Sequence, residues 1–570
     1  MKTIMEKKAY QNKIVGKTLS VLLLCVFSSF TTWAQPAWTK KATKSVFTVK
    51  TFNAEGALIG SSNGFFVNEQ GDGVSSFAPF KGASRAVVID GQGNEMEVKC
   101  MLGANDTYDV AKFRVAAKKT TPLPMAATQT GDGTTVWLLP YREVKTLPQG
   151  TIQKGETFME NHTYYTVAMT MPDNTVGCPL LNEAGEVIGL MQQPYKQGDT
   201  LSYAVGVKFA NELTINGLSL NDATLRSTQI KKDLPDDLGQ AVFALYLGST
   251  ALDSVSYTTL IEDFINKFPN SPDGYEYRAQ QEVTAGLFDA AAQDMEKAIK
   301  VSEKKDETHF NYSKLILSKE VYLSQNEYSK WSLDKALEEA QEADRINPTP
   351  VYRHQQAVIF YAQKKYEEAY NVYASLFNTE LRSASLFYEA SRCKDMVHDS
   401  TAVLALLDSC VALYEKPYLK EAAPYLLVRA QARLDRNLYR DAVNDFNDYE
   451  ALMPTTVTDR FYYMRHQAEI GGRLYQQALN DIDKAITLSP TTDLYYGEKA
   501  SLQIRVGQYK EALETAKELI EKWPGQSDGY LFLGMAQCLM GQKTEGVKNL
   551  QKAGELGDTQ AAALIEKYGK

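Results

Sequence analysis

The segment "NTVGCPLLNEAGEVIGL", residues 174–190, contains two side chains of types that can do covalent chemistry. Thr175 offers a hydroxyl and Cys178 a thiol, and both groups become nucleophiles when a neighbouring base takes their proton. The only histidine between residues 38 and 214 is His162, in "MENHTYYTV", and the segment itself contains no serine. The elements that carry these residues therefore decide whether a nucleophile and a base can meet.

The region from residue 38 to residue 215 has the pattern of a β domain. Short runs rich in β-branched and aromatic residues, such as "SVFTVKTF", "RAVVID" and "TTVWLLPY", alternate with turns such as "EQGDG" and "DGQGN". Runs of this length and spacing predict a barrel or a sandwich. The pattern alone does not choose between the two.

Three stretches of this region match a family in both content and order. They are "GSSNGFFVNEQGDGVSSFAPFKGA" (residues 60–83), "NDTYDVAKFRV" (residues 105–115) and the segment 174–190, and "LSYAVGVKFANEL" follows them. The region resembles the two-barrel domain of trypsin-like serine peptidases of the HtrA/Deg type. The resemblance implies two β-barrels, with the catalytic residues between them.

The resemblance also locates the positions of the catalytic triad. The histidine position falls on Ala78, the aspartate position on Asp109 and the nucleophile position on Val176. The reaction needs a hydroxyl activated by an imidazole that a carboxylate orients, and neither Ala78 nor Val176 can do this chemistry. The resemblance therefore predicts an inactive domain.

The neighbouring residues do not replace the missing groups. Thr175 and Cys178 are offset from the one position toward which the oxyanion amides converge, and His162 falls in the second barrel instead of the first. Asn174 and Cys178 also stand where the family has glycines in the oxyanion turn. We interpret Asp109 as a structural carboxylate that accepts backbone hydrogen bonds at a strand end.

Residues 216–240, "NGLSLNDATLRSTQIKKDLPDDLGQ", are polar and rich in turn formers, which predicts a linker. From residue 241 to residue 570 the pattern is helical and repeats every 34 residues: His466, Ala500 and Gly534 are equivalent. The period and the small residues resemble the tetratricopeptide repeat (TPR), and about eight units fit the chain.

Repeats of this kind stack into a superhelix whose concave face is lined by the first helix of each pair. The resemblance places these binding candidates on that face: His354, Tyr361, Tyr463, Gln467, Ser501, Ile504, Leu531 and Met535. Each of these side chains could equally pack against the neighbouring repeat. The mixture of aromatic, aliphatic and polar groups favours an extended or helical polypeptide partner over a small molecule.

The N-terminus has the pattern of a secretory signal. A basic stretch through Lys17 precedes "VLLLCVFSSF", and Thr32 and Ala34 are the small residues of a cleavage site, so we expect cleavage after Ala34. The alternative, a membrane anchor, needs about 20 continuous apolar residues, and this run is shorter and interrupted by serine and threonine. A periplasmic or secreted protein without a transmembrane segment is expected.

Charge and motifs exclude several other classes. The formal net charge of −9, with a basic signal segment, argues against nucleic acid as the main partner. The sequence has no P-loop, dinucleotide fingerprint, calcium loop or zinc motif, so no cofactor and no metal are expected.

The cysteines do not form a disulfide framework, although Cys393 and Cys410 could pair across one helical hairpin. The oligomeric state is left open.

Together these features predict a multidomain protein: a signal peptide (residues 1–34), an all-β double barrel of trypsin-like type (38–215), a linker (216–240) and an α-helical TPR solenoid (241–570). The favoured function is an extracytoplasmic interaction scaffold whose peptidase domain is inactive. The alternative is an active HtrA-type serine endopeptidase with a non-standard catalytic site. The residue pair Ala78 and Val176 distinguishes the two.

Overall fold

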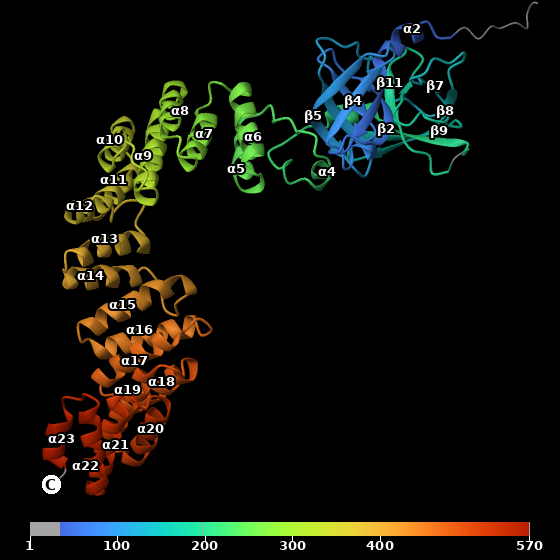
Figure 1. Ribbon diagram of the computed structural model, residues 1–570. Helices are drawn as coiled ribbons and strands as arrows, with labels where there is room; N and C mark the ends of the chain where they lie inside the picture. The colour runs from blue at the N-terminus through green and yellow to red at the C-terminus, as the bar shows by residue number, and fades with distance from the viewer. Residues whose placement is uncertain (1–34, 197, 569–570) are drawn as a thin grey trace, which may run out of the picture. The chain divides into compact units, whose positions relative to one another are not determined.

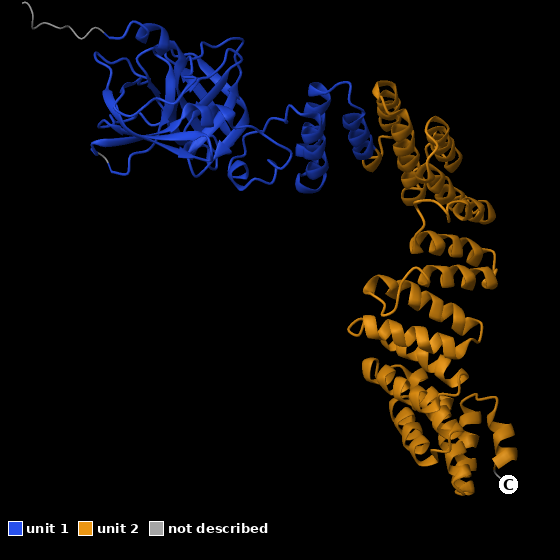
Figure 2. Cartoon of the chain, turned by 180° about the vertical axis from the view of Figure 1, so that it is seen from behind, with its two compact units in different colours: residues 1–282 blue, residues 283–570 orange. Residues whose placement is uncertain are grey.

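The computed structural model describes residues 35–196 and 198–568, so the predicted signal segment, residues 1–34, lies outside the described residues. The chain divides into two compact units, one ending at Glu282 and the other beginning at Val283 (Figure 2). The first unit contains all the described strands, and the second contains only helices. The two units are described separately below.

Six antiparallel strands close the first barrel in the order β1-β2-β3-β6-β5-β4 (Figure 1). Their bounds are β1 Val46–Phe52, β2 Leu58–Phe66, β3 Asp72–Ser75, β4 Arg85–Asp90, β5 Glu95–Asn105 and β6 Val110–Val115. The ring of Phe47 lies in the barrel core, 4.7 Å from the ring of Phe66 and 5.9 Å from that of Phe113. Gly64 makes room for it, because a Cβ there would lie 2.4 Å from a ring carbon of Phe47.

The second barrel closes in the order β10-β11-β12-β9-β8-β7. Its strands are β7 Thr135–Leu138, β8 Gln149–Phe158, β9 His162–Ala168, β10 Pro179–Leu181, β11 Val187–Met191 and β12 Leu201–Gly206. Alternate residues such as Val136, Ile152, Val167 and Met191 fill its interior, as the period of two in the sequence requires. Two barrels, and not a sandwich, form this region.

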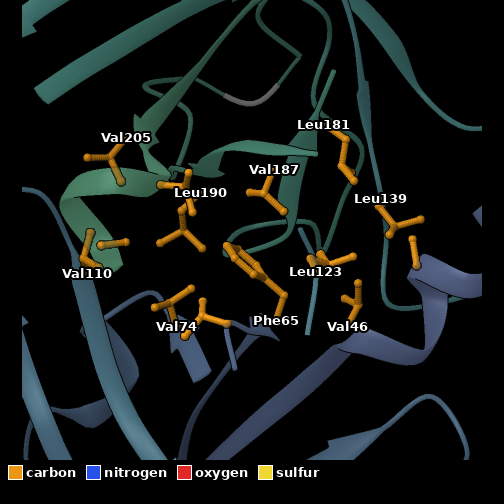
Figure 3. Packing of buried hydrophobic residues seen from close by; sticks show 14 of the residues in the cluster. Val46, Phe65, Val74, Val110, Leu123, Leu139, Leu181, Val187, Leu190 and Val205 are labelled. Carbon is orange, nitrogen blue, oxygen red and sulfur yellow. The ribbon is translucent and has the colours of Figure 1, made fainter. Parts of the chain in front are cut away.

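A third apolar cluster joins the two barrels. Phe65, Val74 and Val110 of the first barrel pack with Val187 and Leu190 of the second (Figure 3). Helix α3 (Val207–Glu212) adds further apolar side chains to the same cluster. Fully burying a side chain of this size stabilises the fold by about 1.5–3 kcal/mol. The shared cluster therefore holds the two barrels together as one body.

The segment 216–240, which the sequence predicts to be a linker, is folded in its middle. Leu225, in the short helix α4 (Ala223–Arg226), and Ile230 are buried in the core of the first barrel. The backbone of Met101 in β5 donates to the carbonyl of Lys231 at 2.7 Å and accepts from the amide of Asp233 at 2.9 Å. Two buried apolar residues together with backbone hydrogen bonds therefore hold this polar stretch on the barrel.

Helices follow one another from residue 238 to the end of the described chain (Figure 1). Their bounds are α5 Leu238–Ala251, α6 Ser254–Lys267, α7 Pro272–Thr284, α8 Phe288–Val301, α9 Lys305–Tyr322, α10 Leu333–Ile346, α11 Pro350–Ala362, α12 Tyr366–Ser375, α13 Ala384–Met396, α14 Ser400–Val411, α15 Ala423–Asp435, α16 Tyr439–Leu452, α17 Asp459–Gly471, α18 Tyr475–Leu488, α19 Asp493–Arg505, α20 Tyr509–Lys522, α21 Ser527–Leu539, α22 Lys543–Glu555 and α23 Ala561–Tyr568.

In the second unit, consecutive helices pack in pairs, such as α15 with α16 and α21 with α22. Ala430 and Ala442 are fully buried in the α15–α16 pair. In the α21–α22 pair a Cβ on Gly534 would lie 2.7 Å from the carbonyl oxygen of Gly546. Small residues therefore let the paired helices approach closely, and the predicted helical solenoid is confirmed.

None of the described helices is both long and apolar enough to cross a membrane. The five cysteines in the described residues are buried and free, so Cys393 and Cys410 are not bonded to each other.

Candidate functional site

The candidate triad positions lie where β2, β3 and β6 of the first barrel meet the loop before β10. Asp109 immediately precedes β6 and has a positive φ of 48°. Its Oδ1 accepts a hydrogen bond from the amide of Ala78 at 2.6 Å, and its Oδ2 accepts one from the hydroxyl of Ser76. The carboxylate thus ties the strand end to the start of the 3₁₀ helix η2 (Ala78–Phe80). Both carboxylate oxygens of Asp109 therefore accept a hydrogen bond, one from the backbone and one from a hydroxyl.

The turn around Val176 is tied to β2 by the adjacent residues Ser62 and Asn63. The carbonyl oxygen of Val176 accepts hydrogen bonds from the backbone amide and the side-chain Nδ2 of Asn63, both at 3.1 Å. The hydroxyl of Ser62 donates to the same oxygen at 3.2 Å, and Asn63 Nδ2 also donates to the carbonyl of Asn174 at 2.8 Å. Asn63 therefore fixes the backbone of this turn.

The contact between β2 and the turn is very close at Gly177. This residue has a φ of +79°, and a Cβ there would lie 2.1 Å from the carbonyl oxygen of Asn63. That oxygen also accepts a hydrogen bond from the hydroxyl of Ser75 at 2.6 Å. Since Ser75 and Ser76 are adjacent in the chain, the hydrogen bonds at Asn63 and Val176 lie next to those of Asp109 and Ala78.

The hydroxyl and the thiol beside Val176 point into the protein. Thr175 is buried, and its Oγ1 donates to the carbonyl of Pro172 at 2.6 Å. Cys178 is buried in the core of the second barrel, where burial raises the pKa of its thiol to about 12. A thiol with so high a pKa is not a nucleophile near neutral pH.

His162 lies at the start of β9, in the second barrel. Its ring contacts the rings of Phe158 and Phe209, with centroids 5.7 and 5.2 Å away, and its Nε2 is 3.7 Å from a carboxylate oxygen of Glu212. The structure thus brings the hydrogen bonds of Ala78, Asp109 and Val176 close together, and it packs His162 against Phe158 and Phe209 of the apolar cluster between the barrels.

The binding candidates in the second unit connect the first helix of one pair to the first helix of the next. His354 on α11 pairs with Glu389 on α13, with Nε2 and Oε2 separated by 2.6 Å. On the same two helices, Arg392 donates to the hydroxyl of Tyr361 at 3.1 Å, and its guanidinium lies 5.0 Å from the centre of that ring. These candidates are therefore surface residues that also pack between repeats.

The same arrangement recurs between α17 and α19. The hydroxyl of Tyr463 accepts from Gln467 Nε2 at 3.1 Å and donates to Glu498 at 3.4 Å. Ser501, Ile504 and Met535 are partly exposed. Leu531 is only 6% exposed and packs in the apolar cluster of α21, α22 and α23, so it fits the packing alternative.

Sequence reasoning missed the partners of these residues. Glu389 and Glu498 each lie 35 residues after their partners, His354 and Tyr463. That offset, close to the repeat period, was the signal that could have identified them. The contact of Asn63 with the turn was hardly predictable, because the sequence shows only a polar residue before the apolar end of β2.

Groups of three or more histidine, cysteine, aspartate or glutamate residues that could hold a metal ion are absent from the described part of the chain. Comparison with protein-family models and with curated proteins finds no match for this chain. The class of the protein therefore rests on its fold: two closed six-stranded barrels followed by a helical solenoid.

Proposed function

We propose that this protein is a non-catalytic polypeptide-binding scaffold, in which a trypsin-like double barrel has lost its chemistry and a TPR array binds the partner. The observation that carries the proposal is the turn at Val176. The nucleophile position has no proton to transfer, and its carbonyl is held by three donors from Asn63 and Ser62. An acyl-transfer site needs the amides of such a turn to converge on a substrate oxygen beside an activated hydroxyl.

The surroundings of the turn support the same proposal. The hydroxyl of Thr175 is bonded to a carbonyl, the thiol of Cys178 is buried, and the ring of His162 packs against Phe209 of α3. Asp109, the one triad residue that remains, is engaged by Ser76 and Ala78. Each group that could do the chemistry has another structural contact.

A fluorophosphonate probe tests the loss of catalysis. We expect no labelling of the full chain, and none of the Thr175→Ala variant, under conditions in which an active serine peptidase is fully labelled. Labelling of the wild type that disappears in Thr175→Ala would establish a relocated nucleophile and the alternative function, an active endopeptidase. We also expect Val176→Ser with Ala78→His to restore little activity, because Asn63 still holds the turn.

We place the main partner site on the face of the helical array that carries His354, Tyr361, Tyr463 and Gln467. Rings and charged groups at regular intervals suit an extended or helical peptide, and bonds between repeats, such as Arg392 to Tyr361, hold these groups in place before binding. The predicted signal segment puts this function outside the cytoplasm, in the periplasm or secreted.

Capture experiments test the partner site. The tagged full chain is used to capture partners from the envelope fraction, which mass spectrometry identifies. The double variant Tyr361→Ala with Tyr463→Ala should lose at least about tenfold in affinity, because aromatic residues at interface centres are frequent hot spots. Tyr322→Ala, at a tyrosine that is 77% exposed on α9, is the matched control. Undiminished capture by the double variant would exclude this face.

A further inference from the structure

Helix α5 has apolar side chains on two opposite faces. Among the described α-helices, it alone contains no aspartate, glutamate, lysine or arginine. One face packs on α6 (Figure 1), and it consists of Ala241, Ala244, Leu245 and Gly248. A Cβ on Gly248 would lie 2.7 Å from a side-chain carbon of Leu260 in α6, so the two helices are in close contact. Since a helix that is hydrophobic all round is normally buried, the other face of α5 also requires a cover.

The opposite face of α5 is exposed to solvent. Phe243 is 40% exposed and Tyr246 is 59% exposed, and their rings stack with centroids 6.3 Å apart. Gly217 is held against this face, because its amide donates to Gln240 Oε1 at 2.9 Å and a Cβ there would meet the Phe243 ring at 2.7 Å. The next residue, Leu218, is 60% exposed. Large apolar side chains thus gather on the outer side of an uncharged helix.

The place of α5 in the chain makes this exposure unusual. It is the first of the consecutive helices that begin at residue 238. Terminal helices of a repeat array need a polar outer face to keep the array soluble. Apolar side chains that are grouped on a surface, unlike scattered ones, mark an interaction site. The outer face of α5 is therefore a candidate interface.

The spacing of the exposed face shows what can cover it. Its residues Gly239, Phe243, Tyr246 and Thr250 are all exposed, and they follow one another at intervals of four, three and four. This spacing forms a stripe along a helix by which two helices pack lengthwise. The occupant that fits is therefore a second helix with an uncharged stripe of the same spacing.

Helix α5 itself meets that requirement, because its stripe is self-complementary. When two copies run antiparallel about a twofold axis, Phe243 faces Tyr246 of the second copy and Gly239 faces Thr250. The large rings then meet in the middle and the smaller residues at the ends. Charge also favours this contact: the chain has a net charge of −9, so two copies repel each other, and an uncharged helix adds no repulsion at the contact.

We propose that two copies of this chain form a twofold dimer through antiparallel packing of their α5 helices. The 14 residues of α5 span about 21 Å. One helix pair of this length buries less than the roughly 1,200–2,000 Å² of stable complexes. The dimer is therefore weak and reversible, with a Kd on the order of 10 µM.

Sedimentation equilibrium of the full chain tests the dimer. The wild type should change from monomer to dimer as its concentration rises through about 10 µM. The double variant Phe243→Lys with Tyr246→Lys should weaken the dimer at least tenfold, because it removes two aromatic contacts and places like charges opposite each other. Both side chains are exposed, so the fold tolerates the change. Val321→Lys with Tyr322→Lys, an exposed pair on α9, is the matched control and should dimerise normally.

A mixing experiment distinguishes contact between two copies from binding of another protein. The variant Phe243→Glu with Tyr246→Glu should also be monomeric when it is alone. An equimolar mixture of the lysine and glutamate variants should form a heterodimer, because opposite charges then face each other across the twofold axis. This rescue also shows that both variants are folded. A mixture that stays monomeric would overturn the proposal, since the two α5 faces would then not meet.

Hydrogen exchange of the wild type gives a test without substitutions. The α5 amides should exchange more slowly at a chain concentration above the Kd than below it, whereas those of α9 should not change. A wild type that is still monomeric at about 200 µM would assign the face to another partner and overturn the proposal. Dimers that both double variants leave intact, or oligomers larger than dimers, would overturn it as well.

This proposal does not depend on the function assigned to the helical array. The variant Tyr361→Ala with Tyr463→Ala should dimerise as the wild type does. Loss of partner capture with intact dimerisation, and the reverse, therefore separate the two sites.

Discussion

Replacing Glu469 with glutamine should stabilise the α17–α18 hairpin, and the gain should grow as the pH rises. Glu469 lies on α17 and is 4% exposed, and its Oε2 has no hydrogen-bond partner among the described residues. Arg465 Nε is 4.0 Å from its other oxygen, but Arg465 already binds Asp481 at 2.5 Å and Glu450 at 2.6 Å. Burial, with the charge of Asp481, therefore raises the pKa of Glu469 to about 8.

The size of the effect follows from this pKa. The ordinary value is 4.5, and one pKa unit corresponds to about 1.4 kcal/mol. Because the folded pKa is raised, the contribution of the carboxyl to stability is complete below pH 4.5 and is lost as the pH rises through 8. Glutamine cannot ionise, so the variant should gain almost nothing at pH 4.5, about 3 kcal/mol at pH 7 and about 5 kcal/mol at pH 9.

Hydrogen exchange of the α17 and α18 amides, followed by mass spectrometry on the full chain, measures this gain locally. The ratio of wild-type to variant rates at one pH cancels the intrinsic pH dependence of exchange. A gain of 3 kcal/mol slows exchange about a hundredfold when exchange reports the opening equilibrium. Glu521→Gln, at an exposed position on α20, is the control. A ratio that stays constant with pH, or faster exchange in the variant at pH 8, would show that Glu469 is ionised and paired with Arg465.

Three further outcomes test other parts of the structure. Burial lowers the pKa of His466 in the folded protein below its ordinary value of 6.5. The contribution of the neutral imidazole to stability is therefore complete above pH 6.5, and it is lost as the pH falls through the lowered pKa of the folded state. In the Glu469→Gln background, the ratio of the α17 exchange rates to those of the same chain carrying His466→Asn, taken at each pH, should therefore rise from pH 7 to pH 5. Gly133 and Gly177 both have a positive φ, but only Gly177 is crowded. Gly133→Ala should cost about 1–2 kcal/mol and Gly177→Ala clearly more, as measured by denaturant unfolding of the barrels. Finally, trypsin should spare Lys231 and Lys232 while the first barrel is folded, because Leu225 and Ile230 hold this segment on the barrel. The Leu225→Asp variant should expose both cleavage sites. Early cleavage of the wild type at either lysine would contradict this prediction.

The sequence by itself determined the kinds of element and their order. Runs of β-branched and aromatic residues between glycine-rich turns predicted the β region, and the 34-residue spacing of His466, Ala500 and Gly534 predicted paired helices. Both patterns are local. The periodicity of strands and helices, and the small residues where two helices cross closely, depend only on residues within one supersecondary unit. The sequence also showed that Ala78 and Val176 lack the atoms for acyl transfer, since that depends only on residue type.

Contacts between distant segments were decided only by the tertiary structure. Asn63 bonds to the carbonyl of Val176, 113 residues away, and this contact exists only once both barrels have closed and packed on their shared core. Leu225 and Ile230 lie in a polar stretch, and the docking of that stretch depends on the edge of β5. Leu531 has the spacing of a surface residue but is buried. Side-chain burial and hydrogen bonding depend on which surfaces meet, and in a chain with two barrels and many repeats that information is not local.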